Sequence, residues 1–172
     1  MTRANMLNAL LFQLNWFACV IGGAHDQPFW ALLTLSVMFA HIARRDTLRA
    51  DVILALGAAA IGLTLDSLWI ASGILDYGTR FAPVWIVMMW MGAALSLNHS
   101  LAWLKSQPWL GGILAAMLAP VCYLSGESLG AVTVDNAGLP VVAISWLVVF
   151  GLGLRMADSF TRATEHRDTQ TS

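Results

Sequence analysis

The chain alternates long apolar stretches with short polar segments along its whole length. A helix that crosses about 30 Å of hydrocarbon needs roughly 17 to 25 mostly apolar residues, so length decides which stretches qualify. Six qualify, and they cover residues 4–24, 27–43, 51–75, 82–104, 108–132 and 138–158. The pattern predicts an all-α, polytopic membrane bundle of six transmembrane helices in one domain, residues 1–160. Residues 161–172 are polar and predict a disordered tail.

Composition supports a lipid environment. Of the 172 residues, 58% are hydrophobic and 11% are charged, whereas a soluble domain carries about 25% charged residues to wet its surface. The net charge of −1 excludes the broad basic surface that binds nucleic acid, so we expect no nucleic-acid partner.

The positions of Lys and Arg predict the orientation of the bundle. Eight of the nine lie in the terminal segments and in the second and fourth loops, which six spans place on one side of the membrane. Only Arg80 lies on the other side. Because cytoplasmic loops retain Lys and Arg, we expect both termini in the cytoplasm.

Polar side chains inside the apolar stretches are candidates for function. Asp66 lies 15 residues after Asp51, about 22 Å along a helix. A carboxylate in hydrocarbon costs about 2.5 to 3.5 kcal/mol, so it must be paired, protonated or hydrated. We expect an elongated polar cavity in which Asp66 and His99 occupy different depths. The other candidates for its lining are Gln13, Trp16, Trp69, Asn98, Ser100, Tyr123 and Glu127.

Simpler explanations stay open for these residues. Amide and hydroxyl side chains also hydrogen-bond neighbouring helices without binding a ligand. Glu127 lies 19 residues after Pro108, near the end of its stretch, where a solvated carboxylate needs no partner. Cys19 and Cys122 could form a disulfide only if the first and fifth helices touch.

Motifs of the common enzyme classes are missing from the sequence. The four histidines are dispersed without metal-ligand spacing, so we expect no metal site. Neither cysteine belongs to a C-x-x-C motif, and no phosphate-binding or dinucleotide-binding glycine pattern occurs, so we expect no cofactor. The sequence identifies no catalytic residue and leans against an enzyme.

Four strings carry a resemblance to a known family: N-A-L-L-F-Q-L-N-W at 8–16, G-L-T-L-D-S-L-W-I-A-S-G-I-L at 62–75, L-N-H-S-L-A-W-L at 97–104 and A-P-V-C-Y-L-S-G-E-S-L-G-A-V at 119–132. They resemble a family of small, uncharacterised bacterial inner-membrane proteins. The matching residues are Phe12, Gln13, Trp16, Asp66, Asn98, His99, Ser100, Pro120, Tyr123 and Gly126. The resemblance implies location in the inner membrane. Members are often encoded beside enzymes similar to cyclopropane-fatty-acid synthases, which implies a link to lipid modification.

We therefore expect a membrane protein that binds or handles a lipid or another amphipathic small molecule in a polar cavity, in connection with membrane lipid modification. The alternative is a small transporter or a substrate-capture subunit of an uptake system. A membrane enzyme that uses Asp66 or His99 as acid or base, and a purely structural subunit, are further alternatives. The expected partners are membrane lipids, and a membrane protein or a second copy of the chain could add to them.

Overall fold

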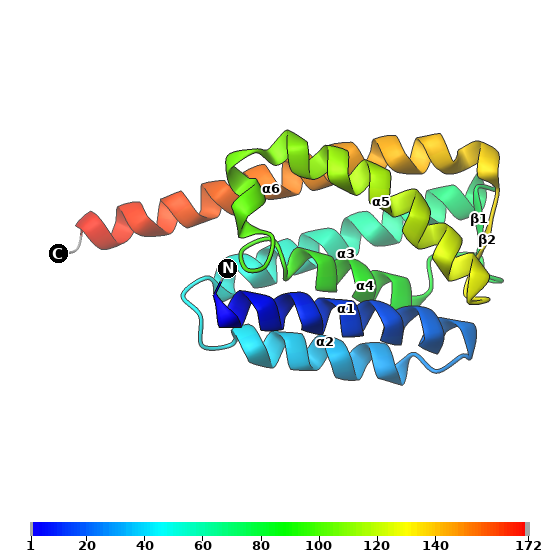
Figure 1. The fold of residues 1–172 in the computed structure, drawn as a ribbon, viewed down its shortest axis with the longest axis horizontal. Coiled ribbons are helices and arrows are strands. Elements are labelled where there is room, and N and C mark those ends of the chain that lie inside the picture. The colour runs from blue at the N-terminus through cyan, green and yellow to red at the C-terminus, as the bar shows by residue number, and fades with distance from the viewer. Residues whose placement is uncertain (1, 171–172) are drawn as a thin grey trace.

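The fold comes from a computed structural model, which describes residues 2–170 and, for residues 161 and 163–170, the backbone alone. Within this part the chain forms six α-helices (Figure 1): α1 Arg3–Ala24, α2 Phe29–Ile42, α3 Leu48–Ala71, α4 Val84–Ala94, α5 Pro108–Ser128 and α6 Leu139–Gln170. The short 3-10 helices η1 (Ala102–Ser106) and η2 (Asn136–Gly138) precede α5 and α6. The prediction of an all-α fold is confirmed.

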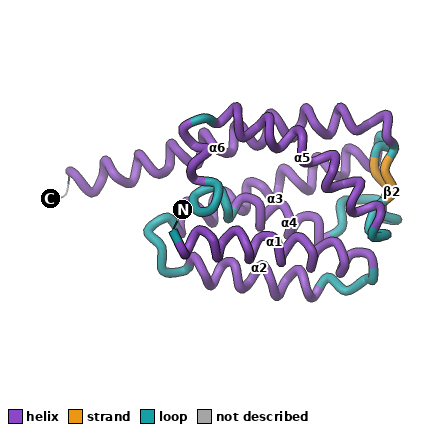
Figure 2. Tube along the Cα trace, viewed as in Figure 1, coloured by secondary structure: helices purple, strands orange, loops and turns teal. Residues whose placement is uncertain are grey.

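The helices pack in pairs that lie roughly along one axis (Figure 1). α1 packs against α2 and α4, α3 packs against α4, and α5 forms a long hairpin with α6. Two short strands, β1 (Leu75–Asp76) and β2 (Thr133–Val134), pair antiparallel and join the loop after α3 to the loop after α5 (Figure 2). The α5–α6 hairpin is therefore attached to the other helices at both of its ends, by η1 and by this ribbon.

Four helical segments are long and apolar enough to cross a membrane: Arg3–Ala24, Leu48–Ala71, Pro108–Ser128 and Asn136–Phe160. They indicate a multi-pass membrane protein. The other two apolar helices are shorter, with 14 residues in α2 and 11 in α4. At about 1.5 Å per residue, these cover only about 21 and 17 Å of the hydrocarbon. The expectation of six full spans therefore holds for four helices.

The expected helix 82–104 is wrong in its second half, because α4 ends at Ala94 and residues 95–101 form turns. Side chains from α1 bind the freed backbone groups. Asn8 Nδ2 donates to the Leu95 carbonyl over 3.2 Å, and Asn8 Oδ1 accepts from the Ser100 N–H (3.2 Å) and hydroxyl (2.7 Å). Non-helical backbone is tolerated at membrane depth only when protein covers it in this way.

The end of α6 also differs from the prediction. The backbone of residues 161–170 continues α6 as a helix where the sequence predicted a disordered tail. No Gly or Pro follows Gly153, so no residue stops the helix. Arg162 adds an ion pair with Asp158 one turn earlier, 2.7 Å between Nη2 and Oδ2. Residues 171 and 172 of the predicted tail lie outside the described part.

Candidate functional site

Asp66 is fully buried on α3 and is bound by three neutral donors. Its Oδ1 accepts hydrogen bonds from the hydroxyls of Tyr77 (2.7 Å) and Tyr123 (3.1 Å). Its Oδ2 accepts from Trp90 Nε1 over 2.8 Å. Tyr77 lies in the loop after α3, Trp90 on α4 and Tyr123 on α5. Each of these three elements thus supplies one donor. Burying a carboxylate requires such partners, as the sequence predicted for this position.

The sequence around Asp66 explains how the donors reach it. One turn before Asp66, Gly62 has no Cβ, and a Cβ there would overlap the Trp90 indole ring. The glycine lets Trp90 lie directly on α3 with its N–H toward the carboxylate. Gly73 has a φ of +76°, a left-handed conformation that ends the helical stretch and turns the chain back toward Tyr77.

Tyr77 lies in the loop after α3, outside the helices that are long enough to span a membrane. Burial, together with the neighbouring Tyr123 and Asp66 groups, raises the pKa of the Tyr77 phenol well above its ordinary value. The phenol therefore stays protonated at physiological pH and remains a donor to Asp66.

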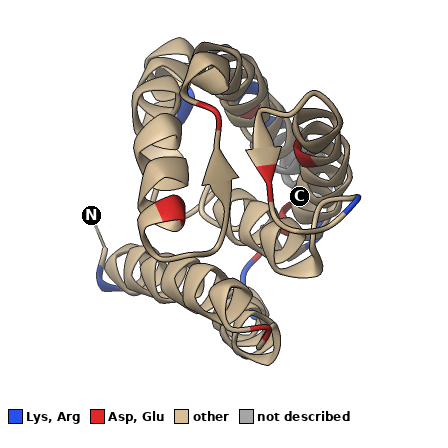
Figure 3. Ribbon diagram, turned by 90° about the vertical axis from the view of Figure 1, so that its right-hand side faces the viewer, with Lys and Arg blue, Asp and Glu red and all other residues tan. Residues whose placement is uncertain are grey.

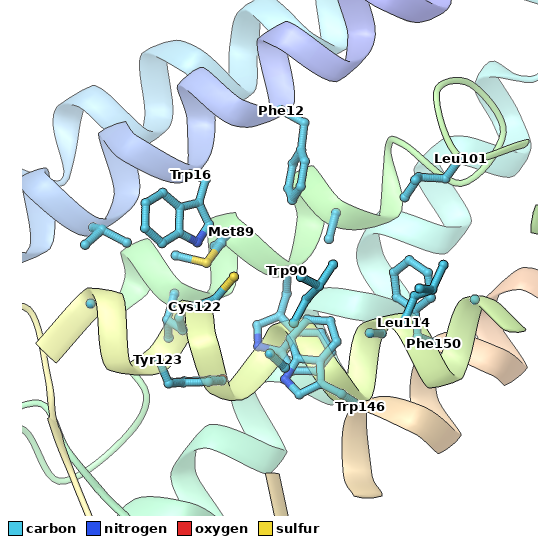
Figure 4. A pocket seen from close by; sticks show the side chains of 18 of the residues that line it. Phe12, Trp16, Met89, Trp90, Leu101, Leu114, Cys122, Tyr123, Trp146 and Phe150 are labelled. Carbon is cyan, nitrogen blue, oxygen red and sulfur yellow. The ribbon is translucent and has the colours of Figure 1, made fainter. Parts of the chain in front are cut away.

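A cavity of about 380 Å³ runs between the α1–α4 pair and the α5–α6 hairpin (Figure 4). Phe12 and Trp16 of α1 form one wall, and α5 forms the other wall with Cys122 among its residues. Trp90 of α4 and Trp146 of α6 stack at the floor, with ring centroids 4.3 Å apart and planes 14° apart. We call this cavity the trough. Its lining is almost entirely aliphatic and aromatic.

The trough is open along its side and bounded at its ends. Leu101 and Leu104 border it at the η1 end, and Tyr77 and Val132 border it at the end of the β ribbon. The two walls belong to α1 and α5, which pack on other helices. On the α5 wall, Leu118 is 59% exposed. Both α1 and α5, which border the open side, are long and apolar enough to cross a membrane.

Asp66 contributes to the trough through its donors. Tyr77, Trp90 and Tyr123 all line the trough, whereas the carboxylate itself does not. The carboxylate lies behind the three rings and fixes the direction of each polar atom away from the cavity. The wall therefore presents ring carbon to a ligand while the polar atoms of the rings are satisfied.

A second buried carboxylate, Asp51, lies at the start of α3 and was not among the predicted site residues. Its Oδ2 accepts from the Thr47 hydroxyl (2.8 Å) and lies 2.9 Å from His99 Nε2, and its Oδ1 accepts from Asn98 Nδ2 (2.8 Å). The side chain is fully buried. This cluster fixes the turns after α4 to α3.

Asp66 lies 15 residues after Asp51 on α3. Because His99 contacts Asp51, it lies at the start of α3, away from Asp66 near the other end of the same helix. A signal for Asp51 was present in the sequence, since Thr47 precedes it by one helical turn and Ser or Thr often begins a helix. However, Asp51 lies at the end of a predicted span, where a carboxylate can be hydrated by solvent and needs no partner in the protein.

The remaining candidates lie in different places. Gln13 is exposed on α1, and Trp69 is buried with its ring edge-to-face to Tyr123, 5.9 Å between centroids. Glu127 Oε1 accepts from the Val134 N–H over 2.9 Å and so binds the end of α5 to β2. Ser100 is bound to Asn8 as described above. Of the predicted lining residues, Trp16 and Tyr123 line the trough. The structure thus has an apolar trough where the sequence predicted a polar cavity.

Among the described residues, the cysteines are unpaired and no cluster of metal-binding side chains is found. Cys19 is buried and Cys122 is exposed at the trough, and both are free thiols. Among residues 2–170, as far as their side chains are described, no three His, Cys, Asp or Glu side chains are grouped to hold a metal ion.

Comparison with known proteins gives a family without an assigned activity. No curated protein and no solved structure matches the chain. A family model described as a protein of unknown function (DUF2878) matches residues 5–152, which include all residues of the trough and of the Asp66 and Asp51 clusters. The chain belongs to this DUF2878 family of uncharacterised proteins.

Proposed function

We propose that this protein binds the hydrocarbon chain of a membrane lipid, or of another amphipathic small molecule, in the trough. The observation that carries the proposal is an aromatic-lined cavity of about 380 Å³ that opens sideways between two membrane-length helices. Its volume falls within the roughly 300 to 1,000 Å³ of small-molecule sites. An opening toward hydrocarbon favours a lipid over a water-soluble substrate, and so favours lipid handling over uptake of a solute.

The length of the trough supports a chain in extended form. On α5 its lining runs from Gly111 to Gly126, which is about 22 Å of helix. One leaflet of a bilayer contributes only about 15 Å of hydrocarbon, half of the whole. A long chain that lies along α5 would therefore reach past the middle of the membrane. The link to lipid modification, which the family resemblance implies, is part of this proposal.

Filling the trough should displace the bound chain. Ala115 of α5 lines the trough, so Ala115→Trp places an indole in its centre. We expect native mass spectrometry of the detergent-purified protein to detect bound lipid on the wild type and about tenfold less on this variant. The matched control is Met117→Trp, because Met117 lies on the same helix, is 67% exposed and does not line the trough. A wild type without bound lipid, or equal retention by both variants, would contradict the proposal.

We also propose that both termini face the cytoplasm of a bacterial inner membrane. The loop between α2 and α3, which holds Arg44 and Arg45, and η1, which holds Lys105, lie at the end of the bundle that carries the N-terminus (Figure 1). Arg80 follows β1 by four residues, in the loop beside the β ribbon. A fluorescent protein fused after Ser172 should be fluorescent, because it folds in the cytoplasm. Alkaline phosphatase inserted after Gly78 should be active, because it needs the oxidising side. The reverse pattern would contradict this orientation.

A further inference from the structure

We infer that the trough selects hydrocarbon chains of about 18 carbons, bound with the methyl end of the chain against Tyr77 and Val132 at the β ribbon. This inference rests on the proposed function and adds the length and the direction of the bound chain. It follows from three features of the trough: its length along α5, its closed end at the ribbon and its exposed end at η1.

The length of the trough sets the length of the chain. Its lining on α5 begins at Gly111 and ends at Gly126, about 22 Å along the helix. Three consecutive bonds of an extended backbone span at most about 3.3 to 3.6 Å, and carbon–carbon bonds have similar lengths, so each carbon adds about 1.2 Å. An extended chain that fills the trough therefore has about 18 carbons. A shorter chain leaves part of the lining without contacts.

Tyr77 and Val132 close the end of the trough at the β ribbon. Tyr77 is fixed twice, because its hydroxyl donates to Asp66 over 2.7 Å and its ring lies edge-to-face to the Trp85 ring, 5.5 Å between centroids. Val132 is buried and directly precedes β2, which pairs with β1 and so joins the two loops. Figure 3 views the bundle from this end and shows the two strands between the helices. A chain that reaches this end meets a fixed wall.

The polar headgroup of the ligand belongs at the opposite end. The hydroxyls of Tyr77 and Tyr123 already donate to Asp66, so the ribbon end has no free hydroxyl for a headgroup. At the η1 end, Trp103 lines the trough and is 60% exposed. Tryptophan favours positions where its ring is in apolar surroundings while its N–H reaches water or lipid headgroups. The headgroup therefore lies at η1 and the methyl end at Tyr77.

Retention of a homologous series measures the usable length. The detergent-purified protein is incubated with straight-chain saturated carboxylic acids of 10 to 24 carbons at equal mole fractions in the detergent, and native mass spectrometry measures each acid on the protein. Because all members share the carboxyl group, only chain length varies. On the wild type we expect retention to rise about tenfold from 12 to 18 carbons, because a shorter chain leaves a cavity, and to stop rising beyond about 18.

A block inside the trough tests the direction of the chain. Cys122 lines the trough, is exposed and lies 11 residues after Gly111, about 17 Å along the helix, which corresponds to about 14 carbons from the η1 end. Cys122→Phe should therefore stop the rise at about 14 carbons instead of about 18. The matched control is Val121→Phe, because Val121 is 57% exposed on the same helix and does not line the trough. It should behave as the wild type.

Removing the wall at the ribbon tests the length limit itself. Tyr77→Ala deletes the ring that closes the trough, so retention should continue to rise for at least about two further carbons. Tyr77→Phe deletes only the hydroxyl and should keep the limit of the wild type.

The outcomes that overturn each part differ. Retention that is independent of chain length, or that still rises at 24 carbons on the wild type, would overturn the length limit, and an unchanged limit in Tyr77→Ala would overturn the role of Tyr77. A reversed chain would have its headgroup beside Cys122, so equal loss of all lengths in Cys122→Phe, or no difference from Val121→Phe, would overturn the direction. Retention of no acid at any length would overturn the proposed function.

Discussion

Asp66→Ala should lower the free energy of unfolding by about 3 kcal/mol or more. The change removes the acceptor of Tyr77, Trp90 and Tyr123, and each buried donor left without an acceptor costs about 1 to 3 kcal/mol. Asp66→Asn should cost less, since the amide oxygen still accepts from the tyrosines while its NH₂ group faces the Trp90 N–H. Heat-induced unfolding in detergent, followed by circular dichroism, measures both variants.

The control for this prediction is Asp26→Asn. Asp26 is exposed in the loop between α1 and α2 and has a φ of 55°, a conformation that asparagine also tolerates. This variant should unfold within about 0.5 kcal/mol of the wild type. If Asp66→Ala were as stable as this control, the carboxylate would not hold the three rings, and its role in shaping the trough would have to be abandoned. Loss of bound lipid in Asp66→Asn, at little cost in stability, would further support that role.

Gly62→Ala and Gly57→Ala should change stability in opposite directions, although both are glycine-to-alanine changes in α3. A Cβ on Gly62 would overlap the Trp90 ring, whereas a Cβ on Gly57 meets no atom within 4 Å. Overpacking costs about 1 to 3 kcal/mol, and the displaced indole also loses its bond to Asp66. Gly57→Ala gains helix propensity and should stabilise by about 0.5 to 1 kcal/mol.

The same unfolding experiment tests this pair, with near-ultraviolet circular dichroism as a second readout of the Trp90 environment. Gly62→Ala should reduce that signal and Gly57→Ala should preserve it. Destabilisation of equal size in both variants would show that the loss in Gly62→Ala does not come from the close contact between Gly62 and the Trp90 ring.

The sequence was sufficient to predict Asp66 and part of its surroundings. A carboxylate among apolar residues must be paired, protonated or hydrated, and Tyr123 was a candidate because it shares a helix face with Glu127 and belongs to a string that resembles a known family. Tyr77 and Trp90 were not predicted, because one lies in a loop and the other among ordinary apolar residues. Only the folded loop after α3 and the absence of a side chain at Gly62 bring these donors to the carboxylate.

The break after α4 could have been predicted from local composition. Residues 96–100 are Ser, Leu, Asn, His and Ser, so four of these five positions are polar. Averaging the hydrophobicity over about 20 residues, the length of a span, conceals this short polar segment. The trough could not be predicted, because it depends on which helices fail to pack together. α1 and α5 each have an apolar surface typical of a span, and sequence alone does not distinguish a lipid-facing surface from the wall of a cavity.

The turns after α4 also constrain how the chain enters the membrane. With 11 helical residues, α4 is too short to insert as an independent span. The polar segment that follows it is covered by Asn8 and Asp51, which precede Ser100 and His99 by 92 and 48 residues. These contacts require α1 and α3 to lie beside the turns. We therefore expect the turns after α4 to become covered only once α1 and α3 have reached their places in the bundle.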